Sequence, residues 1–483
     1  MCNTPYKMLV VIGLIYCSFS SVFAYNYSGG GGVDGDPYLI TTVGDMTHLM
    51  SSAARDEEGW SKYFILTADL SMNWTHPLTP IGDSGKNFTG DFDGDGHIIF
   101  RVAVGTGPPA TDYVGIFGII GSGGHIKGLG VDANVYGNSY VGILAAENHG
   151  RIENCYTTGE AMGNTYSGGL VGKNCDTGII TGCHSLATVR PGFGYVLEDH
   201  LHAGGLTGEN QGTITDCYAI CTVSGKGDIG GLVGENLGGS ITDCYTTGIA
   251  IGDFNVGGLI GCNGSGGSVS RCWATGEVNG TYTAGGLVGA NGYTNGTTSS
   301  ISDCYATGDV NGYQYIGGLV GRNDYGDSGL GNITHCYSTG KVQKGVDYHG
   351  GLVGYNSLGS VIDSFWDTET SDWDDEELGR GTGKTTAEMQ TESTFTSVGW
   401  DFTNTWAICP TNYPLLRWQK LQPDFLCPDG VDLYDFAFFA KHWMEYPCSD
   451  PTWCEYTDLN KDSTVNFKDI AIFVQDWLET YKP

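Results

Sequence analysis

The chain has 483 residues, of which 40% are apolar, so it is long enough to build two or three domains around a substantial core. Its 22 basic and 54 acidic residues give a net charge of −32, which argues against nucleic acid or an anionic membrane surface as a partner and favours bound cations. The 79 glycines lack the triplet period of collagen and instead indicate an unusual number of turns.

The first 24 residues have the features of an export signal. Lys7 precedes an apolar run over residues 8–16, and Val22 and Ala24 supply the small residues of a cleavage site. The run is shorter than the ~20 residues that a membrane-spanning helix needs, and no other segment is apolar for long enough to span a bilayer. We therefore predict a signal peptide at residues 1–24, a secreted or cell-surface location and no membrane insertion.

The middle of the chain is a repeat with a period of about 27 residues, which is typical of a solenoid. Each repeat contains a sequence of the type Gly-Gly-Leu-Val-Gly, and short β-type runs bounded by Gly, Asn, Asp and Ser follow it. The second residue of each such sequence is Gly115, Gly142, Gly169, Gly205, Gly231, Gly258, Gly286, Gly318 or Gly351. Three short strands per repeat fit one coil of a parallel β-helix, so we predict an all-β solenoid of about nine or more coils.

Three side-chain columns follow the same register. The first is Asn174, Asn210, Asn236, Asn263, Asn291, Asn323 and Asn356, with Asn148 one place late. Because Asn tolerates a left-handed backbone, we expect these residues at corners, in an internal hydrogen-bonded ladder. The second is Cys155, Cys183, Cys217, Cys244, Cys272, Cys304 and Cys336, which predicts a buried column of packed thiols and leaves disulfides between rungs open.

An aromatic column runs beside the cysteines. It comprises Tyr156, His184, Tyr218, Tyr245, Trp273, Tyr305, Tyr337 and Phe365. Strand alternation points these rings outward, where they serve either as a platform for sugars or another protein, or only as a stack that stiffens the rod.

The longest insertion interrupts the repeats between Cys183 and Gly205. A loop that projects from a regular rod is a candidate for grasping a ligand or a metal, although a plain surface loop explains the same residues. The candidate ligand residues are Arg190, Phe193, Tyr195, Glu198, Asp199, His200 and His202.

The repeats resemble the GLUG motif, named for its Gly-Leu-x-Gly core, over residues 111–368. Residues 25–110 resemble the segment that precedes such repeats, a cap and first coils, and residues 369–420 resemble the segment that closes them. The resemblance implies an exported or surface-associated bacterial protein, in some cases an adhesin, and implies no catalytic activity.

The pattern of oxygen-bearing residues in segment 421–483 predicts a calcium site. Two amphipathic helices are expected, over residues 431–444 and 465–478, with an oxygen-rich loop before the second. The predicted ligands are the side chains of Asp458, Asn460, Asp462, Asn466 and Asp469 and the carbonyl of Thr464. This alternation suits the six to eight oxygens that Ca²⁺ takes, although Ser463 stands where the turn usually has Gly.

The repeated loop and helix resemble a type I dockerin, which docks onto cohesins in polysaccharide-degrading assemblies. The resemblance implies a cohesin-like partner and a weaker first calcium site at Asp429, Asp432 and Asp435. It places the partner-reading positions on Leu433, Tyr434, Phe467 and Lys468. Cys448 and Cys454 in the connecting loop are candidates for a disulfide.

The sequence thus predicts a non-catalytic binding or adhesion protein that takes a polysaccharide or cell-surface glycan, docks through Ca²⁺ and has no assigned catalytic residue. One alternative is a polysaccharide lyase or glycoside hydrolase, because β-helices also carry such enzymes. A second alternative is a structural spacer of the cell envelope.

Overall fold

The computed structural model describes residues 25–483 apart from several short segments. Outside the description lie residues 52, 55–58, 74–78, 106–110, 193–201, 294–296, 325–329, 344, 375–378, 410, 420–432, 449–456, 458, 460–462 and 481–483. The predicted signal peptide, residues 1–24, also lies outside it.

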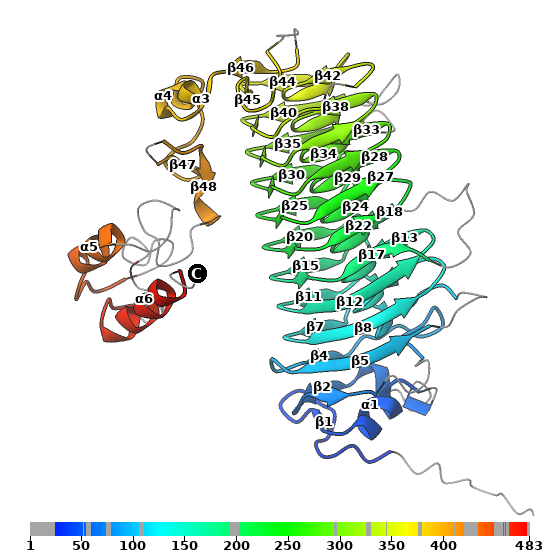
Figure 1. Cartoon of the computed structure of the whole chain (residues 1–483). Helices are drawn as coiled ribbons and strands as arrows, with labels where there is room; N and C mark the ends of the chain where they lie inside the picture. Colours follow the sequence, from blue (N-terminus) through cyan, green and yellow to red (C-terminus); the bar gives the residue numbers. More distant parts are fainter. Residues whose placement is uncertain are drawn as a thin grey trace, which may run out of the picture.

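The architecture is a parallel β-solenoid of about 11 turns, which confirms the predicted fold class (Figure 1). One coil runs through β23 (Ile229–Gly230), β24 (Val233–Leu237), β25 (Ser240–Thr242), β26 (Tyr245–Thr246) and β27 (Ile249–Gly252). Each of these strands pairs in parallel with its counterparts in neighbouring coils, so the sheets run along the length of the rod. Strands alternate with turns in this arrangement, and many of the glycines lie where a Cβ would meet the backbone of a neighbouring coil.

Four strand columns build the solenoid. The first is a twelve-stranded sheet of β1 (Tyr38–Ile40), β2 (Tyr63–Leu66), β4 (Asp91–Asp93), β7 (His125–Lys127), β11 (Arg151–Glu153), β15 (Ile179–Thr181), β20 (Thr213–Thr215), β25, β30 (Ser268–Ser270), β35 (Thr298–Ser302), β40 (Leu330–Thr334) and β44 (Ser360–Ile362). The second is a nine-stranded sheet of β6 (Phe117–Ile120), β10 (Ala145–Asn148), β14 (Val171–Asn174), β19 (Thr207–Asn210), β24, β29 (Ile260–Gly264), β34 (Val288–Tyr293), β39 (Val320–Arg322) and β43 (Val353–Tyr355).

The other two columns complete each coil. An eight-stranded sheet consists of β9 (Val141–Gly142), β13 (Tyr166–Gly168), β18 (His202–Gly204), β23, β28 (Asn255–Gly257), β33 (Thr283–Gly285), β38 (Tyr315–Gly317) and β42 (His349–Gly350). The last column consists of β3 (Leu70–Ser71), β5 (Ile98–Val104), β8 (Gly130–Tyr136), β12 (Tyr156–Gly163), β16 (His184–Ser185), β17 (Thr188–Pro191), β21 (Tyr218–Ala219), β22 (Thr222–Ser224), β26, β27, β31 (Trp273–Ala274), β32 (Val278–Gly280), β36 (Tyr305–Ala306), β37 (Val310–Gly312), β41 (Tyr337–Ser338), β45 (Phe365–Asp367) and β46 (Thr382–Lys384).

The observed register corrects the sequence alignment of the coils by one residue. Gly142 pairs with Gly168, not with Gly169, and Asn148 consequently faces Asn174 directly. Close packing between coils explains why the second glycine of the Gly-Gly-Leu-Val-Gly sequence recurs. At Gly231, a Cβ would lie 2.0 Å from the carbonyl oxygen of Gly258 in the next coil. Coils stack too closely at this point for any side chain.

The predicted asparagine ladder is present. From Asn148 to Asn323 each side-chain amide donates to the side-chain oxygen of the next rung at 2.8 Å, and the ladder continues to Asn356. The prediction that these residues sit at left-handed corners was wrong, because they lie in or beside strands and none has a positive φ. The left-handed corner is instead the residue before each ladder cysteine, for example Asp243 with φ 54°.

The cysteine column is a packed column of free thiols, as predicted. All seven residues are buried and none is disulfide-bonded. Each thiol donates to the carbonyl two residues earlier, as Cys244 does to Thr242 at 3.1 Å. This local hydrogen bond satisfies each sulfur without a covalent link between coils.

Half of the aromatic column is covered by the segment that follows the repeats. This segment contains α3 (Thr386–Met389), α4 (Glu392–Thr396), β47 (Trp406–Ala407), β48 (Leu415–Leu416) and the short turn η2 (Arg417–Gln419). Its Trp400 and Trp406 join Tyr305, Tyr337 and Phe365 in one buried cluster. The Tyr337 hydroxyl donates to the carbonyl of Pro414 at 2.6 Å, so the segment folds back along the rod.

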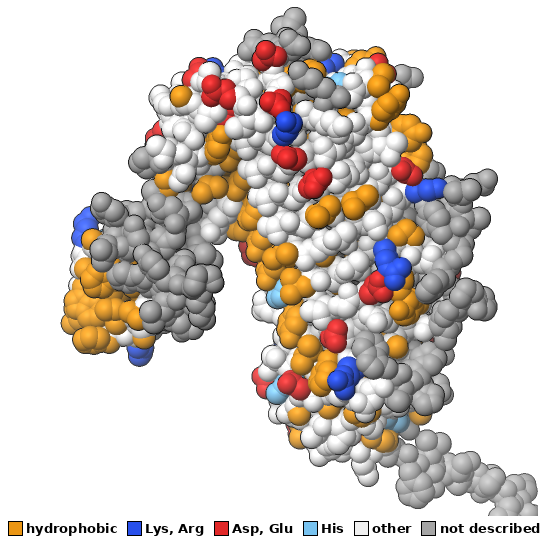
Figure 2. Space-filling view, in the orientation of Figure 1, with side chains coloured by type: hydrophobic (Ala, Val, Ile, Leu, Met, Phe, Trp, Pro, Cys, Tyr) orange, Lys and Arg blue, Asp and Glu red, His pale blue; other side chains and the backbone are white. Residues whose placement is uncertain are grey.

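The rings in the other half of the column stack on one another, and Tyr245 among them also contacts Trp418 of η2. The centroids of Tyr156, His184, Tyr218 and Tyr245 follow at 5.3, 4.6 and 4.9 Å with nearly parallel planes. Each ring face lies against a neighbouring ring, so only the ring edges are accessible. This arrangement favours a stiffening role over a sugar-binding platform. Figure 2 shows hydrophobic side chains gathered along the edge of the solenoid nearest the C-terminal segment.

The remaining helices lie at the two ends of the chain. The N-terminal region has α1 (Val43–Leu49) and the short turn η1 (Gly59–Ser61). The C-terminal region has the two predicted helices, α5 (Leu433–Lys441) and α6 (Phe467–Thr480). They share a small core in which Phe439, Val465 and Phe473 are buried.

Candidate functional site

The described part of the predicted calcium loop contains one left-handed residue and a buried carboxylate. Ser463 adopts φ 74°, the left-handed turn usually given to glycine. Asp469 is fully buried, and its carboxylate accepts the backbone N–H of Asn466 at 2.8 Å. The side chain of Asn466 donates to the carbonyl of Thr464 at 2.9 Å. This donor set fits a hard cation, whose remaining predicted ligands, Asp458, Asn460 and Asp462, lie outside the described residues.

The first half of the C-terminal segment is described only in part. Asp429 and Asp432 lie outside the described residues, and Leu433, Tyr434 and Asp435 begin α5 without described side chains. Of the predicted partner-reading residues, Phe467 is 76% exposed at the start of α6, next to the exposed Lys468. Cys448 is disulfide-bonded, and its predicted partner Cys454 lies outside the described residues.

The candidate ligand loop is described only at its two ends. Arg190 lies in β17 and forms an ion pair with Glu160 of the preceding coil. His202 lies in β18 and stacks on Tyr166 with ring centroids 5.1 Å apart. Phe193, Tyr195, Glu198, Asp199 and His200 lie outside the described residues.

His202 belongs to a buried acid cluster that sequence reasoning missed. Its Nδ1 lies 3.0 Å from Oδ2 of Asp228 and 3.5 Å from Oε2 of Glu235. The amide of Asn255 donates to the other oxygen of Asp228 at 2.7 Å and fixes the carboxylate toward His202. Burial raises the pKa of Glu235 to about 7. For His202, desolvation lowers the pKa, but hydrogen bonding to Asp228 and the nearby carboxylates outweigh it, so the pKa is raised overall.

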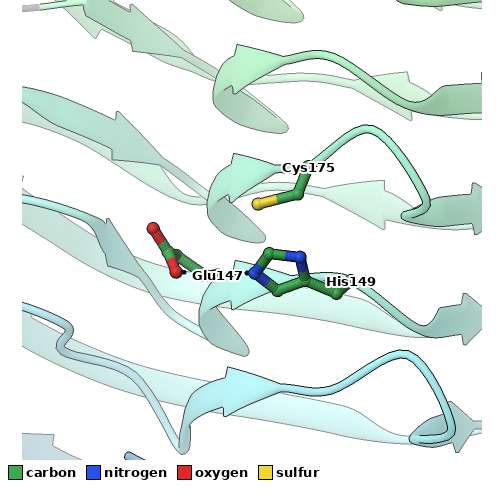
Figure 3. A group of neighbouring side chains, drawn as sticks. All are labelled: Glu147, His149 and Cys175. Carbon is green, nitrogen blue, oxygen red and sulfur yellow. Dashed lines mark ion pairs between the residues drawn. The ribbon is translucent and has the colours of Figure 1, made fainter. Parts of the chain in front are cut away.

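A second ionisable group lies lower on the same side of the solenoid, and Figure 3 shows its side chains converging. Glu147 and His149 flank the ladder residue Asn148, and Cys175 follows the next rung, Asn174. The three donor atoms lie within 4.8 Å of one another. Burial and the neighbouring Glu147 raise the pKa of the Cys175 thiol to about 12. The register of the asparagines was the signal in the sequence that could have revealed this group.

The outward face of β27, β32 and β37 carries a polar groove with a volume of about 370 Å³. Asn279 and Asn311 are register partners in neighbouring coils, and the amide of Asn311 donates to Asn279 at 3.1 Å and to Glu277 at 2.9 Å. The groove also includes Ile251, Asp253, Thr281 and Gln343. Amides in such a row offer donors and acceptors to a polyhydroxylated chain, and Ile251 adds an apolar contact.

The solenoid contains repeats that match the GLUG motif. The family model of the GLUG motif matches residues 225–251, 280–311 and 312–343, within the predicted repeat region. Among the described residues, no helix combines the length and the apolar character needed to cross a bilayer.

Two curated proteins are similar to part of the chain. Halomucin of Haloquadratum walsbyi is 31% identical over 165 residues, which is 32% of this chain and 2% of that protein. A protein of Evansella cellulosilytica, named as a Gly-rich membrane protein, is 32% identical over 158 residues, which is 30% of this chain and 17% of that protein. The chain thus matches only a small share of these relatives.

Two solved structures are also similar to the chain, at lower sequence identity. One is named as an immunoglobulin A1 protease from Bacteroides ovatus, with 20% identity, a TM-score of 0.36 and coverage of 82% of this chain and 96% of that one. Another is named IgA1 Protease, with 15% identity, a TM-score of 0.39 and coverage of 80% of this chain and 25% of that one.

Proposed function

We propose that this protein is a secreted or cell-surface binding protein without catalytic activity. Its solenoid presents a glycan-binding surface, and its C-terminal segment docks it through Ca²⁺ onto a cohesin-like partner. The relatives named halomucin and Gly-rich membrane protein support the surface location. The predicted signal peptide agrees with export.

The observation that carries glycan binding is the amide groove along β27, β32 and β37. Successive coils repeat its polar groups at the ~4.8 Å spacing of strands, so a linear polysaccharide laid along the rod meets similar donors and acceptors several times. The stacked ring column is a weaker candidate, because its faces are already occupied.

Docking is supported by the paired helices α5 and α6 and by the loop between them. The left-handed Ser463 and the buried Asp469 are compatible with a calcium loop despite the missing glycine. Exposed Phe467 and Lys468 at the start of α6 offer a partner-facing surface. When bound, Ca²⁺ would neutralise the carboxylates of the loop and hold its turn; Asp458, Asn460, Asp462, Thr464, Asn466 and Asp469 would hold the ion.

The groove predicts a measurable loss of glycan affinity when its amides are removed. Asn279→Ala and Asn311→Ala should each weaken the binding of a recognised polysaccharide about tenfold, because a hydrogen bond is worth about 1.4 kcal/mol here. The measurement is a binding isotherm of the full chain on a polysaccharide panel. Exposed Asn332, on the twelve-stranded sheet, provides the control Asn332→Ala, which should bind normally.

The same panel separates the three candidate functions. Binding without product release supports the binding protein, release of reducing sugars or unsaturated products supports the enzyme, and neither result supports the spacer. The enzyme alternative has one specific observation in its favour, the adjacent carboxyls of Asp228 and Glu235. Glu235, with its pKa of about 7, would be the candidate acid.

A further inference from the structure

The asparagine ladder brings three donor side chains of different chemistry to one point. Asn148 and Asn174 pair in register, and the amide of Asn148 donates to Asn174 at 2.8 Å. Because Glu147 and His149 flank the first rung and Cys175 follows the second, the stacking of two coils fixes all three. Glu147 lies in β10, and His149 and Cys175 are the first residues after β10 and β14.

Cys175 differs from the cysteines of the ladder. Each ladder thiol donates to a carbonyl two residues earlier, whereas no hydrogen bond of the Cys175 sulfur is found among the described residues. The residue is nevertheless only 5% exposed, and in Figure 3 its sulfur points toward Glu147 and His149. A buried thiol directed at an imidazole and a carboxyl can serve as a metal ligand.

The spacing of the Glu147 and His149 donor atoms suits two ligands of one metal ion. Oε2 of Glu147 and Nε2 of His149 are 3.7 Å apart, too far for a hydrogen bond. Tetrahedral Zn²⁺ with bonds of about 2.0 to 2.3 Å holds neighbouring ligand atoms roughly 3.3 to 3.7 Å apart. In the His202 cluster the contact between Nδ1 of His202 and Oδ2 of Asp228 is 3.0 Å, shorter than this range.

The surrounding charge is compatible with a cation. Lys173 lies in the same column, but its ammonium is paired with the buried carboxylate of Glu209 at 3.0 Å. Glu147 and an ionised Cys175 supply two negative charges, which balance a divalent ion.

We propose that Glu147, His149 and Cys175 bind a transition-metal ion of the Zn²⁺ type, with water at the fourth tetrahedral position. On binding, the thiol of Cys175 releases its proton to solvent and forms the metal–sulfur bond. The sulfur and imidazole donors distinguish this site from the oxygen-only calcium loop. The site is separate from the proposed glycan groove and from the docking segment.

The test uses the metal-stripped full chain with Co²⁺ as a spectroscopic probe, in excess Ca²⁺ to occupy the C-terminal loop. We expect one equivalent of Co²⁺ to give a sulfur-to-cobalt charge-transfer band in the near ultraviolet, which Zn²⁺ displaces. Cys175→Ala should abolish the band, and His149→Ala should weaken Co²⁺ binding at least tenfold. Cys262→Ala is the matched control, because Cys262 is a free and buried cysteine of β29; it should keep the band.

The proposal is overturned if the wild-type chain shows no band, if the band survives Cys175→Ala, or if Cys262→Ala removes it. Circular dichroism checks that each variant is folded. Should Cys175→Ala fail to fold, His149→Ala decides the question, since its side chain is 35% exposed and its removal leaves the core intact. Unchanged Co²⁺ affinity in folded His149→Ala would also contradict the site.

Discussion

Replacing Asn263 by alanine should destabilise the solenoid by about 3 kcal/mol. Its fully buried amide donates to Asn291 at 2.8 Å and to the carbonyl of Gly267 at 3.2 Å, and its oxygen accepts from Asn236 at 2.8 Å. Alanine leaves these buried groups without partners, and each such group costs about 1 to 3 kcal/mol. Denaturant unfolding of the full chain measures the loss, and hydrogen exchange locates it in coils around residue 263.

The matched comparison is Cys272→Ala in the same coil. Cys272 is equally buried, but its thiol makes only weak hydrogen bonds, to the carbonyls of Ser270 at 3.1 Å and Ile241 at 3.8 Å. We expect a loss of about 1 kcal/mol, the value for a buried group of methylene size. Equal losses for the two variants would contradict the view that the asparagines bind the coils together while the cysteines fill space.

Glu235→Gln should change how stability depends on pH. The pKa of Glu235 is raised from 4.5 to about 7 in the folded chain. Between these values the unfolded chain releases the proton that the folded chain retains, so stability falls as pH rises. A shift of this size corresponds to about 3 kcal/mol. Relative to wild type, the glutamine variant should therefore gain about 3 kcal/mol between pH 4 and pH 8.

The measurement is the unfolding free energy of both proteins at pH 4, 6 and 8. His202, whose pKa is also raised, contributes stability that is present below pH 6.5 and lost as pH rises through its folded pKa. Asp228, which also raises the pKa of His202, maintains part of that slope in the variant, whereas the part that comes from the charge of Glu235 is lost with it. Glu392→Gln, at an exposed position in α4, should show no such gain; the same gain there would contradict the assignment.

The regular features of the solenoid were predictable from sequence because they recur once per coil. The asparagine and cysteine ladders, the parallel strands and the helices α5 and α6 all follow from periodicity. The register error at Gly169 arose because one coil of 26 residues, between Gly142 and Gly168, is indistinguishable by motif alone from one of 27. Likewise, the left-handed corner at Asp243 was assigned to the asparagines because both residue types tolerate it.

The features missed from sequence depend on contacts between distant segments. Tyr337 meets Pro414 only because the closing segment folds back along the rod, and no local pattern encodes that path. The raised pKa of Glu235 depends on burial against the neighbouring coil. The proximity of His149 and Cys175, in contrast, could have been predicted from the sequence, since each residue follows an asparagine of the same ladder.

The most direct test of the proposed function is binding of the full chain to cohesin modules in Ca²⁺ and in a calcium chelator. We predict capture in Ca²⁺, loss in chelator, and loss for Asp458→Ala and Asp462→Ala, which remove predicted ligands. Asp176→Ala, at an exposed turn of the solenoid, should bind normally. Failure to bind any cohesin in Ca²⁺, or equal binding with the chelator, would contradict a calcium-dependent docking module.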